Sequence, residues 1–511
     1  MKRTIAIAAL LILAVLAFGQ ERADRYVPGR LIILLSPDFE TKCETGQDGF
    51  FKTGLPALDE LNARYGAVEG RYLVPVREMR GEFRQKSHNW RNIILVKFSD
   101  RDMDMVELAR IYSQLPEVTA CEPDFIKDQR VTTPDDTKYH SAWHLDKIQA
   151  NYAWDFQKGS PDVVVSCFEG SDWAHPDLAP VVWNNLGEDA DGDGRTIEPH
   201  YSFPDGGYVW RFDPDDINGI DDDGNGYTDD LVGWDFIEEI DGEETIIHPD
   251  EDAEEEDMDP MDDIGYVGHG THVSGTMVIG TDNGYGCSSV SWNTRAAILR
   301  TDYVYYVEEY RDWHGAHNSS STIPAFSYGN AMGFDVYCLS YGGYSRSGIV
   351  EAVLREAWDS CGVIICAAAG NENTEELSYP ASYVGVLGVA ATNQSDYRAE
   401  FSNYGSRIDI SAPGVTIWSS MPRHNVVSGD RSFPYEGTDG TSMAAPVVGG
   451  AAALLMSEYP DSSNRFIYSR IVDSAEPMPD PMFEEDLLGE GRLNIFKALY
   501  QDVFPYFELD S

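Results

Sequence analysis

The amino-acid sequence predicts an α/β protein: a three-layer domain with a mainly parallel central sheet, preceded by a small α+β domain. After Trp143, short apolar runs alternate with helix-length segments, which suits a parallel sheet with helices on both faces. Before Asp124, strand-like and helical patterns follow one another in closer succession. The length of 511 residues is above the usual single-domain range, so more than one domain is expected.

The chain begins with the pattern of a secretory signal peptide. A basic start at Met1-Lys2-Arg3 precedes an apolar run up to Phe18, and Ala17-Phe18-Gly19 is a plausible cleavage site. We therefore expect residues 1–19 to be removed and the protein to be secreted, either into a periplasm or outside the cell. No later stretch is apolar for long enough to cross a bilayer, so no membrane association is expected after signal removal. The oligomeric state stays open.

The small α+β domain is expected over residues 27–128. Strand-like and helical segments alternate there, and a polar linker follows at 129–142, where Pro134-Asp135-Asp136 favours a turn. The expected strands are 31–35, 92–98 and 118–122, and the expected helices are 55–65 and 105–114.

The larger domain is expected over residues 143–505. Its strands are predicted where short apolar runs occur, and in such folds the chemistry collects at the carboxyl ends of the strands. The predicted strands are 163–167, 296–299, 336–339, 363–367 and 384–389.

The charge balance excludes nucleic acid as a partner. Lys and Arg number 37 against 87 Asp and Glu, a formal net charge of −50 that would repel phosphate and attract cations. The seven cysteines show no metal-ligand spacing. Those near apolar runs, namely Cys167, Cys338, Cys361 and Cys366, are interpreted mainly as buried small hydrophobes.

A serine at the start of a small-residue helix is the strongest functional signal. Gly440-Thr441-Ser442 precedes a long apolar stretch, so the Ser442 hydroxyl is exposed at a turn while backbone N–H groups of the first helical turn stay unpaired. This arrangement is typical of an acyl-transfer nucleophile. Taken alone, it is equally compatible with a Ser/Thr helix cap.

Two further segments supply candidate partners for Ser442. His269 and His272 lie among glycines in Gly268-His269-Gly270-Thr271-His272, without the Glu of a zinc-protease helix, so a general base is favoured over a metal ligand. Asn371 follows a predicted buried strand, where its amide could donate to an oxyanion. Taken singly, Asn371 is more often a turn residue.

Several motifs in the same order resemble those of the subtilisin-like serine peptidases. They include Trp143-His144-Leu145, His175-Pro176-Asp177-Leu178 and Ala412-Pro413-Gly414, together with the segments around His269, Asn371 and Ser442. The resemblance implies a subtilisin-like fold and a polypeptide substrate, with His269 as general base, Ser442 as nucleophile and Asn371 as oxyanion donor. It implies that the domain before Trp143 is a propeptide that acts as intramolecular chaperone and inhibitor. It also implies a substrate-pairing edge formed by Ser340, Tyr341, Gly342 and Gly343.

One catalytic position departs from the family pattern. Counted without a gap from His175-Pro176-Asp177-Leu178, the triad aspartate falls on Phe168, which cannot accept the Nδ1–H of histidine. Three interpretations stay open. In the first, the protein is a peptidase whose turnover is slowed by about 10⁴-fold. In the second, Glu169 replaces the missing acid, although strand alternation turns its side chain away from His269 unless a bulge intervenes. In the third, the protein is a catalytically inactive pseudopeptidase that acts as a peptide-binding or regulatory protein. The first is favoured.

An acidic insertion is expected over residues 188–263, and it carries candidate calcium ligands. Oxygen donors two residues apart around glycines suit Ca²⁺, although neither loop has the glutamate of an EF-hand's twelfth position. The resemblance adds a third position, where the family often holds a structural calcium. The candidates are Asp221, Asp223, Asn225, Asp229 and Asp230 in one loop, Asp189, Asp191 and Asp193 in another, and Asp177, Asp282 and Asn283 at the third.

Overall fold

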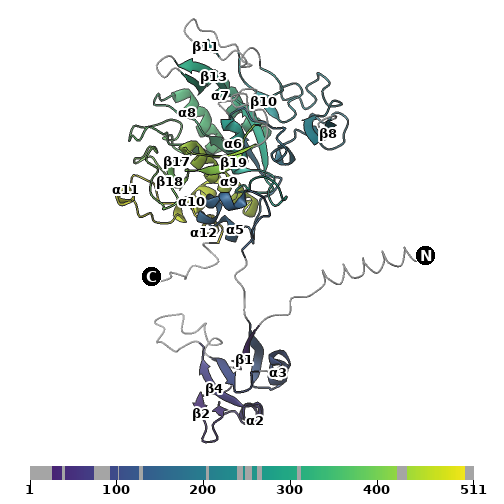
Figure 1. Ribbon diagram of the computed structural model, residues 1–511, viewed down its shortest axis with the longest axis vertical. Helices are drawn as coiled ribbons and strands as arrows, with labels where there is room; N and C mark the ends of the chain where they lie inside the picture. Colours follow the sequence, from purple (N-terminus) through teal and green to yellow (C-terminus); the bar gives the residue numbers. More distant parts are fainter. Residues whose placement is uncertain are drawn as a thin grey trace, which may run out of the picture. The chain divides into compact units, whose positions relative to one another are not determined.

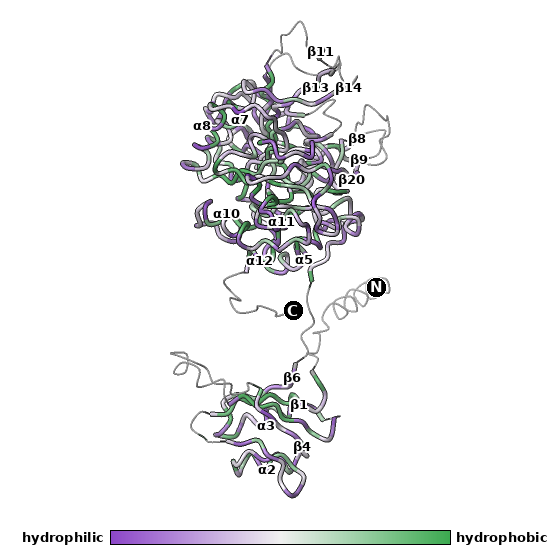
Figure 2. Tube along the Cα trace, turned by 90° about the vertical axis from the view of Figure 1, so that its left-hand side faces the viewer, coloured by the Kyte–Doolittle hydropathy of each residue, from purple (hydrophilic) through white to green (hydrophobic). Residues whose placement is uncertain are grey.

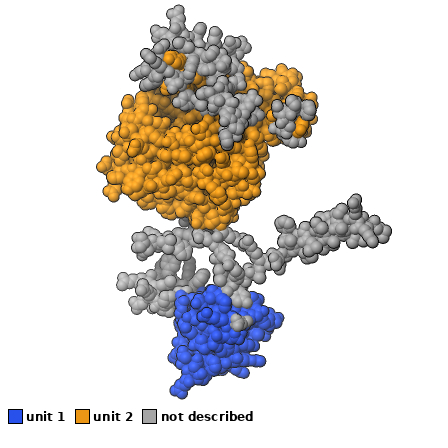
Figure 3. Space-filling model, in the orientation of Figure 1, with its two compact units in different colours: residues 1–129 blue, residues 130–511 orange. Residues whose placement is uncertain are grey.

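A computed structural model describes most of the chain, which divides into two compact units, residues 1–129 and 130–511 (Figure 3). The expected signal peptide, parts of the acidic insertion and the last residues of the expected larger domain lie outside the described residues. The described residues are 26–36, 39, 41–73, 92–101, 103–125, 131–202, 207–238, 246–247, 256–261, 268–307, 312–422 and 434–500.

Unit 1 is a four-stranded antiparallel sheet in the order β4-β5-β1-β6, packed against two helices (Figure 1). Asp104 caps α3 by accepting from the N–H groups of Val106 and Glu107. All five segments predicted for this unit are present, and strand β4 was not predicted. The elements are β1 (Tyr26–Leu35), β2 (Glu44–Thr45), β3 (Phe51–Lys52), α2 (Pro56–Tyr65), β4 (Ala67–Tyr72), β5 (Ile93–Phe98), α3 (Met105–Tyr112) and β6 (Val118–Phe125).

Unit 2 is built on a seven-stranded sheet in the order β10-β12-β7-β15-β16-β17-β18, and every neighbouring pair in it is parallel. The five predicted apolar runs coincide with β7, β12, β15, β16 and β17. The strands are β7 (Val164–Cys167), β10 (Gly233–Asp235), β12 (Arg295–Arg300), β15 (Val336–Leu339), β16 (Ile364–Ala368), β17 (Val386–Thr392) and β18 (Ile410–Pro413).

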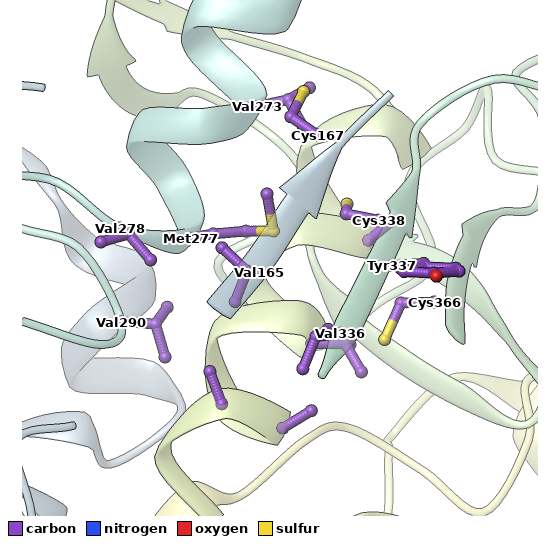
Figure 4. Close-up of a cluster of buried hydrophobic side chains, with 14 of the residues drawn as sticks. Val165, Cys167, Val273, Met277, Val278, Val290, Val336, Tyr337, Cys338 and Cys366 are labelled. Atoms are coloured by element: carbon purple, nitrogen blue, oxygen red, sulfur yellow. The ribbon is translucent and has the colours of Figure 1, made fainter. Parts of the chain in front are cut away.

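Helices cover both faces of this sheet, which gives the predicted three layers. Helix α9 (Thr441–Glu458) packs on the face of Val336, because a Cβ on its Gly449 would lie 3.8 Å from Val336 Cγ1. Tyr337 faces the opposite side, since side chains alternate along a strand. There its ring stacks on Phe326 of α7 (Ser319–Met332) with centroids 6.0 Å apart. Figure 4 shows Met277 of α6 (His269–Met277) reaching towards Val165 of β7, and Figure 2 shows the hydrophobic chain segments gathered inside the unit.

The remaining elements of unit 2 surround this core. The β13–β14 hairpin was not predicted from the sequence, and it borders the carboxyl end of the sheet. These elements are η3 (Tyr139–Ser141), α4 (Trp143–Lys147), α5 (Ala150–Ala153), η4 (Ala179–Val181), β8 (Ile197–Ser202), β9 (Gly207–Phe212), β11 (Ile246–Ile247), β13 (Asp302–Val307), β14 (Asp312–His317), α8 (Gly348–Glu356), η5 (Ala357–Cys361), β19 (Ile417–Ser420), β20 (Tyr435–Thr438), α10 (Asn464–Asp473), α11 (Pro481–Glu484) and α12 (Ile495–Tyr500).

Two expectations about this unit need correction. Residues 132–138, expected within a linker, belong to unit 2 and are hydrogen-bonded to the rest of it: Thr132 N–H donates to the carbonyl of Asn151, and Lys138 N–H to that of Gly286. Cys361, expected to be buried, is exposed, whereas the other three cysteines near apolar runs are buried. Among the described residues, no helix combines the length and apolar character needed to cross a bilayer.

Candidate active site

The candidate catalytic residues line one cleft of about 520 Å³ in unit 2. His269 is the first residue of α6, Ser442 is the second residue of α9, and Asn371 follows β16. Each therefore lies where an element begins or ends, as expected for a site at the carboxyl ends of parallel strands. The predicted substrate edge lines the same cleft, together with Glu169.

The acid that contacts His269 is Glu169. The Nδ1–H of His269 donates to Glu169 Oε2, and the Glu169 residue is 2% exposed. A carboxylate at this position holds the imidazole in one orientation and stabilises its protonated form. The expectation that Glu169 faces away from His269 is therefore wrong.

Phe168 does not occupy the position beside the imidazole. Its ring is fully buried and packs against Phe326 and Tyr337, with centroids 4.8 Å and 5.0 Å away. These partners lie on the α7 face of the sheet, and Phe168 is not among the residues that line the cleft. The carboxylate beside the imidazole thus belongs to the residue after the one on which the ungapped count places the triad acid. Phe168 serves as part of the hydrophobic core.

The orientation of Glu169 follows from where β7 ends. The strand stops at Cys167, and the two residues of the bend that follows keep its alternation: Phe168 faces α7, whereas Glu169 faces α6, as does Cys167, whose Sγ donates to the carbonyl of Gly270. Thr301 Oγ1 donates to the carbonyl of Phe168 at 2.7 Å, and Gly170 N–H donates to Asp302 Oδ1 at 2.8 Å. The backbone on both sides of Glu169 is thereby fixed.

A glycine on the facing helix makes room for this bend. A Cβ on Gly270 would overlap the carbonyl oxygen of Gly170 and lie 2.8 Å from Glu169 Cβ. The Gly-His-Gly segment thus brings His269 and Glu169 together by close backbone approach, a role that no larger residue could fill at Gly270.

The two partners shift each other's protonation. Burial raises the pKa of Glu169, but the charge of His269 and the hydrogen bond to it outweigh burial and hold that pKa below its usual range. Burial lowers the pKa of His269, but the Glu169 carboxylate, with a smaller contribution from Asp302, raises it above its usual value. The pair therefore favours a carboxylate beside an imidazole that readily accepts a proton.

The hydroxyl of Ser442 is held by the predicted substrate edge. Its Oγ donates to the carbonyl of Ser340 at 2.9 Å, and Ser340 Oγ donates in return to the carbonyl of Ser442 at 2.9 Å. Gly343 pairs through its backbone with Tyr379 at 2.9 Å and 2.8 Å. The Ser340–Gly343 segment therefore connects Ser442 to the cleft wall.

Asn371 is oriented by the residue before the nucleophile. Its Oδ1 accepts from the N–H of Thr441 at 2.9 Å and from Thr441 Oγ1 at 3.0 Å. With the carbonyl oxygen of the side chain engaged in this way, the amide orientation is fixed relative to the start of α9.

Among the cleft residues that sequence reasoning missed are Asp302 and His317, at the base of the β13–β14 hairpin. The His317 ring stacks on Tyr341 with centroids 3.9 Å apart, and its Nδ1 lies 3.0 Å from Thr301 Oγ1. Burial lowers the pKa of His317 to about 4. No short motif marks these residues, and the only available signal was the length of chain between β12 and α7.

The acidic loops gather carboxylates in two groups. Oxygens of Glu188, Asp221 and Asp223 lie within 4.8 Å of one another, as do those of Asp189, Asp191 and Asp193. Glu188 is a member that sequence reasoning missed.

Other candidate ligands of the insertion are engaged by neutral donors. Asp230 accepts from Asn185, Asn225 and Tyr328, and burial raises its pKa to about 6. Asp229 accepts from the N–H groups of Asn218 and Gly219. The Asn225 Oδ1 accepts from the N–H of Tyr227 at 2.7 Å.

The third candidate metal position is bridged by hydrogen bonds. Asp177 Oδ1 accepts from Asn283 Nδ2 at 2.7 Å, and its Oδ2 accepts from the hydroxyl of Tyr435 at 3.0 Å. Asp282 Oδ1 accepts from the N–H of Asp135 at 3.2 Å. Burial raises the pKa of Asp177 to about 7. This cluster ties the start of unit 2 to the loop after α6.

Comparison with known proteins adds independent evidence. The chain is 30% identical over 345 residues to a "Thermophilic serine proteinase" of Bacillus sp. (strain AK1), covering 67% of this chain and 64% of that protein. It is 32% identical over 235 residues to subtilisin DY of Bacillus licheniformis, covering 45% of this chain and 77% of that protein. A solved structure of proteases from Pseudoalteromonas arctica PAMC 21717 shares the fold, with a TM-score of 0.53 and 24% identity, covering 72% of this chain and 99% of that one.

The family-level comparison covers most of unit 2. The model described as "Subtilase family" matches residues 161–496, a range that contains Glu169, His269, Asn371 and Ser442. The subtilisin-like fold predicted from the sequence is confirmed. The chain belongs to the subtilase family of serine peptidases.

Proposed function

We propose that this protein is an exported serine endopeptidase in which Ser442, His269 and Glu169 act together on peptide bonds. The contact between His269 Nδ1 and Glu169 Oε2 carries the proposal, because it supplies the acid that the ungapped motif count lacks. The triad would then be complete with glutamate in place of aspartate. The activity need not be slowed by the phenylalanine at position 168.

The reaction assigned to these residues is acyl transfer through a covalent intermediate. His269 Nε2 takes the proton of Ser442 Oγ as that oxygen attacks the scissile carbonyl carbon, and Glu169 stabilises the imidazolium that forms. The Nδ2 group of Asn371 and the N–H groups at the start of α9 would donate to the developing oxyanion. His269 then gives its proton to the leaving amine. Water repeats the sequence to release the acyl group.

Substrate binding would also free the nucleophile. An extended peptide that pairs with the Ser340–Gly343 segment donates a backbone N–H to the carbonyl that now accepts from Ser442 Oγ. Competition for this carbonyl releases the hydroxyl towards His269. A polypeptide is therefore the substrate class that both binds the edge and activates the serine.

Unit 1 and the N-terminus complete the proposal. The apolar start of the chain supports export, and unit 1, with its own hydrophobic core, supports the role of a propeptide inhibitor in a zymogen. Structural Ca²⁺ is proposed at the acidic loops, where three carboxylates in each group offer hard oxygen donors. The ion would stabilise these two loops, which precede β8 and β10 in the sequence.

Labelling with a fluorophosphonate tests the peptidase proposal. The full chain should react at Ser442, and mass spectrometry should locate the adduct there. The Ser442→Ala variant should give no adduct, whereas Glu169→Gln should react much more slowly. A folded wild-type protein that binds peptides but forms no adduct would instead identify a pseudopeptidase.

A further inference from the structure

Two loops of the acidic insertion repeat the same sequence and the same hydrogen bonds. We call residues 189–195 loop A and residues 221–227 loop B. Both follow the pattern Asp-x-Asp-Gly-(Asp/Asn)-Gly, and in both the carboxylate of the first residue accepts from the backbone of the fourth, fifth and sixth. The donors are the N–H groups of Gly192, Asp193 and Gly194 in loop A, at 2.9, 3.1 and 2.8 Å, and of Gly224, Asn225 and Gly226 in loop B, at 2.7, 3.0 and 2.9 Å.

Each loop is closed by a carboxylate from the flank of the other loop. Glu188 directly precedes loop A, yet its Oε1 accepts from the N–H groups of Asp222 and Asp223 in loop B, at 2.9 and 3.0 Å. Asp216 precedes loop B, yet its Oδ1 accepts from those of Ala190 and Asp191 in loop A, at 2.8 and 3.4 Å. In both cases the second and third residues of the loop are the donors.

Asp216 carries the observation that points to a cation. It is 0% exposed, and its Oδ2 is buried without a hydrogen-bond partner among the described residues. A buried carboxylate oxygen is costly unless a donor or a positive charge compensates it. Arg195 pairs with Asp193 at 2.8 Å, but this contact is on the exposed rim and leaves Asp216 uncompensated.

The exchange also supplies the ligand that each loop lacks. An EF-hand loop places a carboxylate at its twelfth position, which falls on His200 when counted from Asp189 and on Val232 when counted from Asp221. Neither residue provides a carboxylate. Glu188 brings one to loop B from outside it, where its oxygen lies within 4.8 Å of those of Asp221 and Asp223, and Asp216 brings one to loop A, where it accepts from the N–H groups of Ala190 and Asp191.

We propose that loops A and B form a pair of Ca²⁺ sites with exchanged ligands, in which Glu188 completes loop B and Asp216 completes loop A. This inference rests on the calcium part of the proposed function and specifies which residues belong to which ion. Loop A is the weaker site, because Arg195 already neutralises part of its charge.

The test is a calorimetric Ca²⁺ titration of the full chain carrying Ser442→Ala, which prevents self-digestion, after removal of metal with a chelator. Two sites are expected. Glu188→Gln and Asp216→Asn should each weaken one site at least tenfold, since loss of a carboxylate near a metal commonly costs 10- to 100-fold in affinity. Both substitutions preserve shape and keep an oxygen that can accept the backbone N–H groups.

Double variants decide the assignment. Under exchange, Glu188→Gln with Asp223→Asn acts twice on loop B and leaves one site intact, whereas Glu188→Gln with Asp191→Asn weakens both sites. Asp216→Asn should behave in the mirror-image way, leaving one site intact with Asp191→Asn and weakening both with Asp223→Asn. The two arms are independent, so a poorly folded variant in one arm leaves the other decisive.

Asp222→Asn is the matched control, because the Asp222 carboxylate accepts from Asn218 Nδ2 on the exposed surface of loop B. This variant should keep both sites. The reverse pattern of double variants would overturn the exchange while retaining calcium. A parent protein that binds no Ca²⁺ would overturn both the exchange and the calcium part of the proposed function, and Ser442 labelling would still report on the peptidase part.

Discussion

Glu169 at the active site and Asp216 in the acidic insertion are both carboxylates with almost no exposed surface, 2% and 0% respectively. Their pKa values nevertheless move in opposite directions. Burial raises the pKa of Asp216, whereas His269 outweighs burial at Glu169 and lowers the pKa there. In this protein, the direction in which the pKa of a buried carboxyl group shifts therefore depends on the group that lies beside it. Glu169 contacts an imidazole, whereas the described residues that act on Asp216 are the N–H groups of Ala190 and Asp191 and the carboxylates of Asp189 and Asp213.

Glu169→Gln removes the negative charge beside His269 and is expected to have the largest effect. The amide keeps the size of the side chain but cannot stabilise an imidazolium, so we expect kcat to fall by about 10⁴. Peptide hydrolysis by the purified enzyme measures the effect, with Asp222→Asn as a control that should retain activity. A Glu169→Gln variant within tenfold of wild type would remove Glu169 from the triad.

Phe168→Asp tests whether a carboxylate at position 168, one residue before Glu169, could serve as the triad acid. The new carboxylate would be buried between Phe326 and Tyr337 without a cationic partner, so we expect a loss of about 3–5 kcal/mol in unfolding free energy. Denaturant unfolding of the Ser442→Ala protein, with and without the substitution, measures it. An increase in activity from Phe168→Asp would contradict this placement of Phe168.

Gly270→Ala tests the close approach that brings Glu169 to His269. The added Cβ must displace the Gly170 backbone, and a shift of about 1 Å in a catalytic group costs on the order of 10²-fold in kcat/KM. Gly348→Ala is the matched control at the start of another helix, since a Cβ there meets nothing within 4 Å. Equal activity of the two variants would show that the fit at Gly270 is unimportant.

The smallest expected effect is a contrast in pH dependence, measured by unfolding of chelator-treated Ser442→Ala protein. Glu188 and Asp216 have pKa values raised by burial above those of the unfolded chain, so they destabilise when ionised. Lowering the pH from 7 towards 5 should protonate these two carboxyl groups and so reduce their destabilising effect on the folded state. Relative to a Glu188→Gln, Asp216→Asn double variant, the parent should gain unfolding free energy as the pH falls through the folded pKa values.

Glu169 should show the opposite sign. Its pKa is lowered in the folded state, so its contribution is present above the unfolded pKa and is lost as pH falls through the folded one. The raised pKa of His269 contributes stability that is lost as pH rises through the folded value. A Glu169→Gln variant should therefore lose stability relative to its parent near pH 6, and an unchanged difference down to pH 3 would refute the pairing.

Much of unit 2 was predictable because its parallel strands are continuous apolar runs, as Val336–Leu339 illustrates. That Ser442 and His269 line one cleft was predictable because both residues lie in short motifs with fixed local geometry. The acid was not, because its position depends on where β7 ends and on a bend held by Thr301 and Asp302, which are distant in sequence. The hydrogen bonds of Glu188 to loop B could not be predicted for the same reason, since the residues that donate to it lie more than thirty positions away in the sequence.

The β13–β14 hairpin joins two tasks that are separate in principle. Its base fixes the backbone around Glu169, and the same hairpin contributes Tyr305 and His317 to the cleft wall. An engineer who grafts a different hairpin to change which peptides are accepted would thus also disturb turnover, unless Thr301 and Asp302 are retained. Under the proposed function, substrate selectivity and turnover therefore depend on the same hairpin.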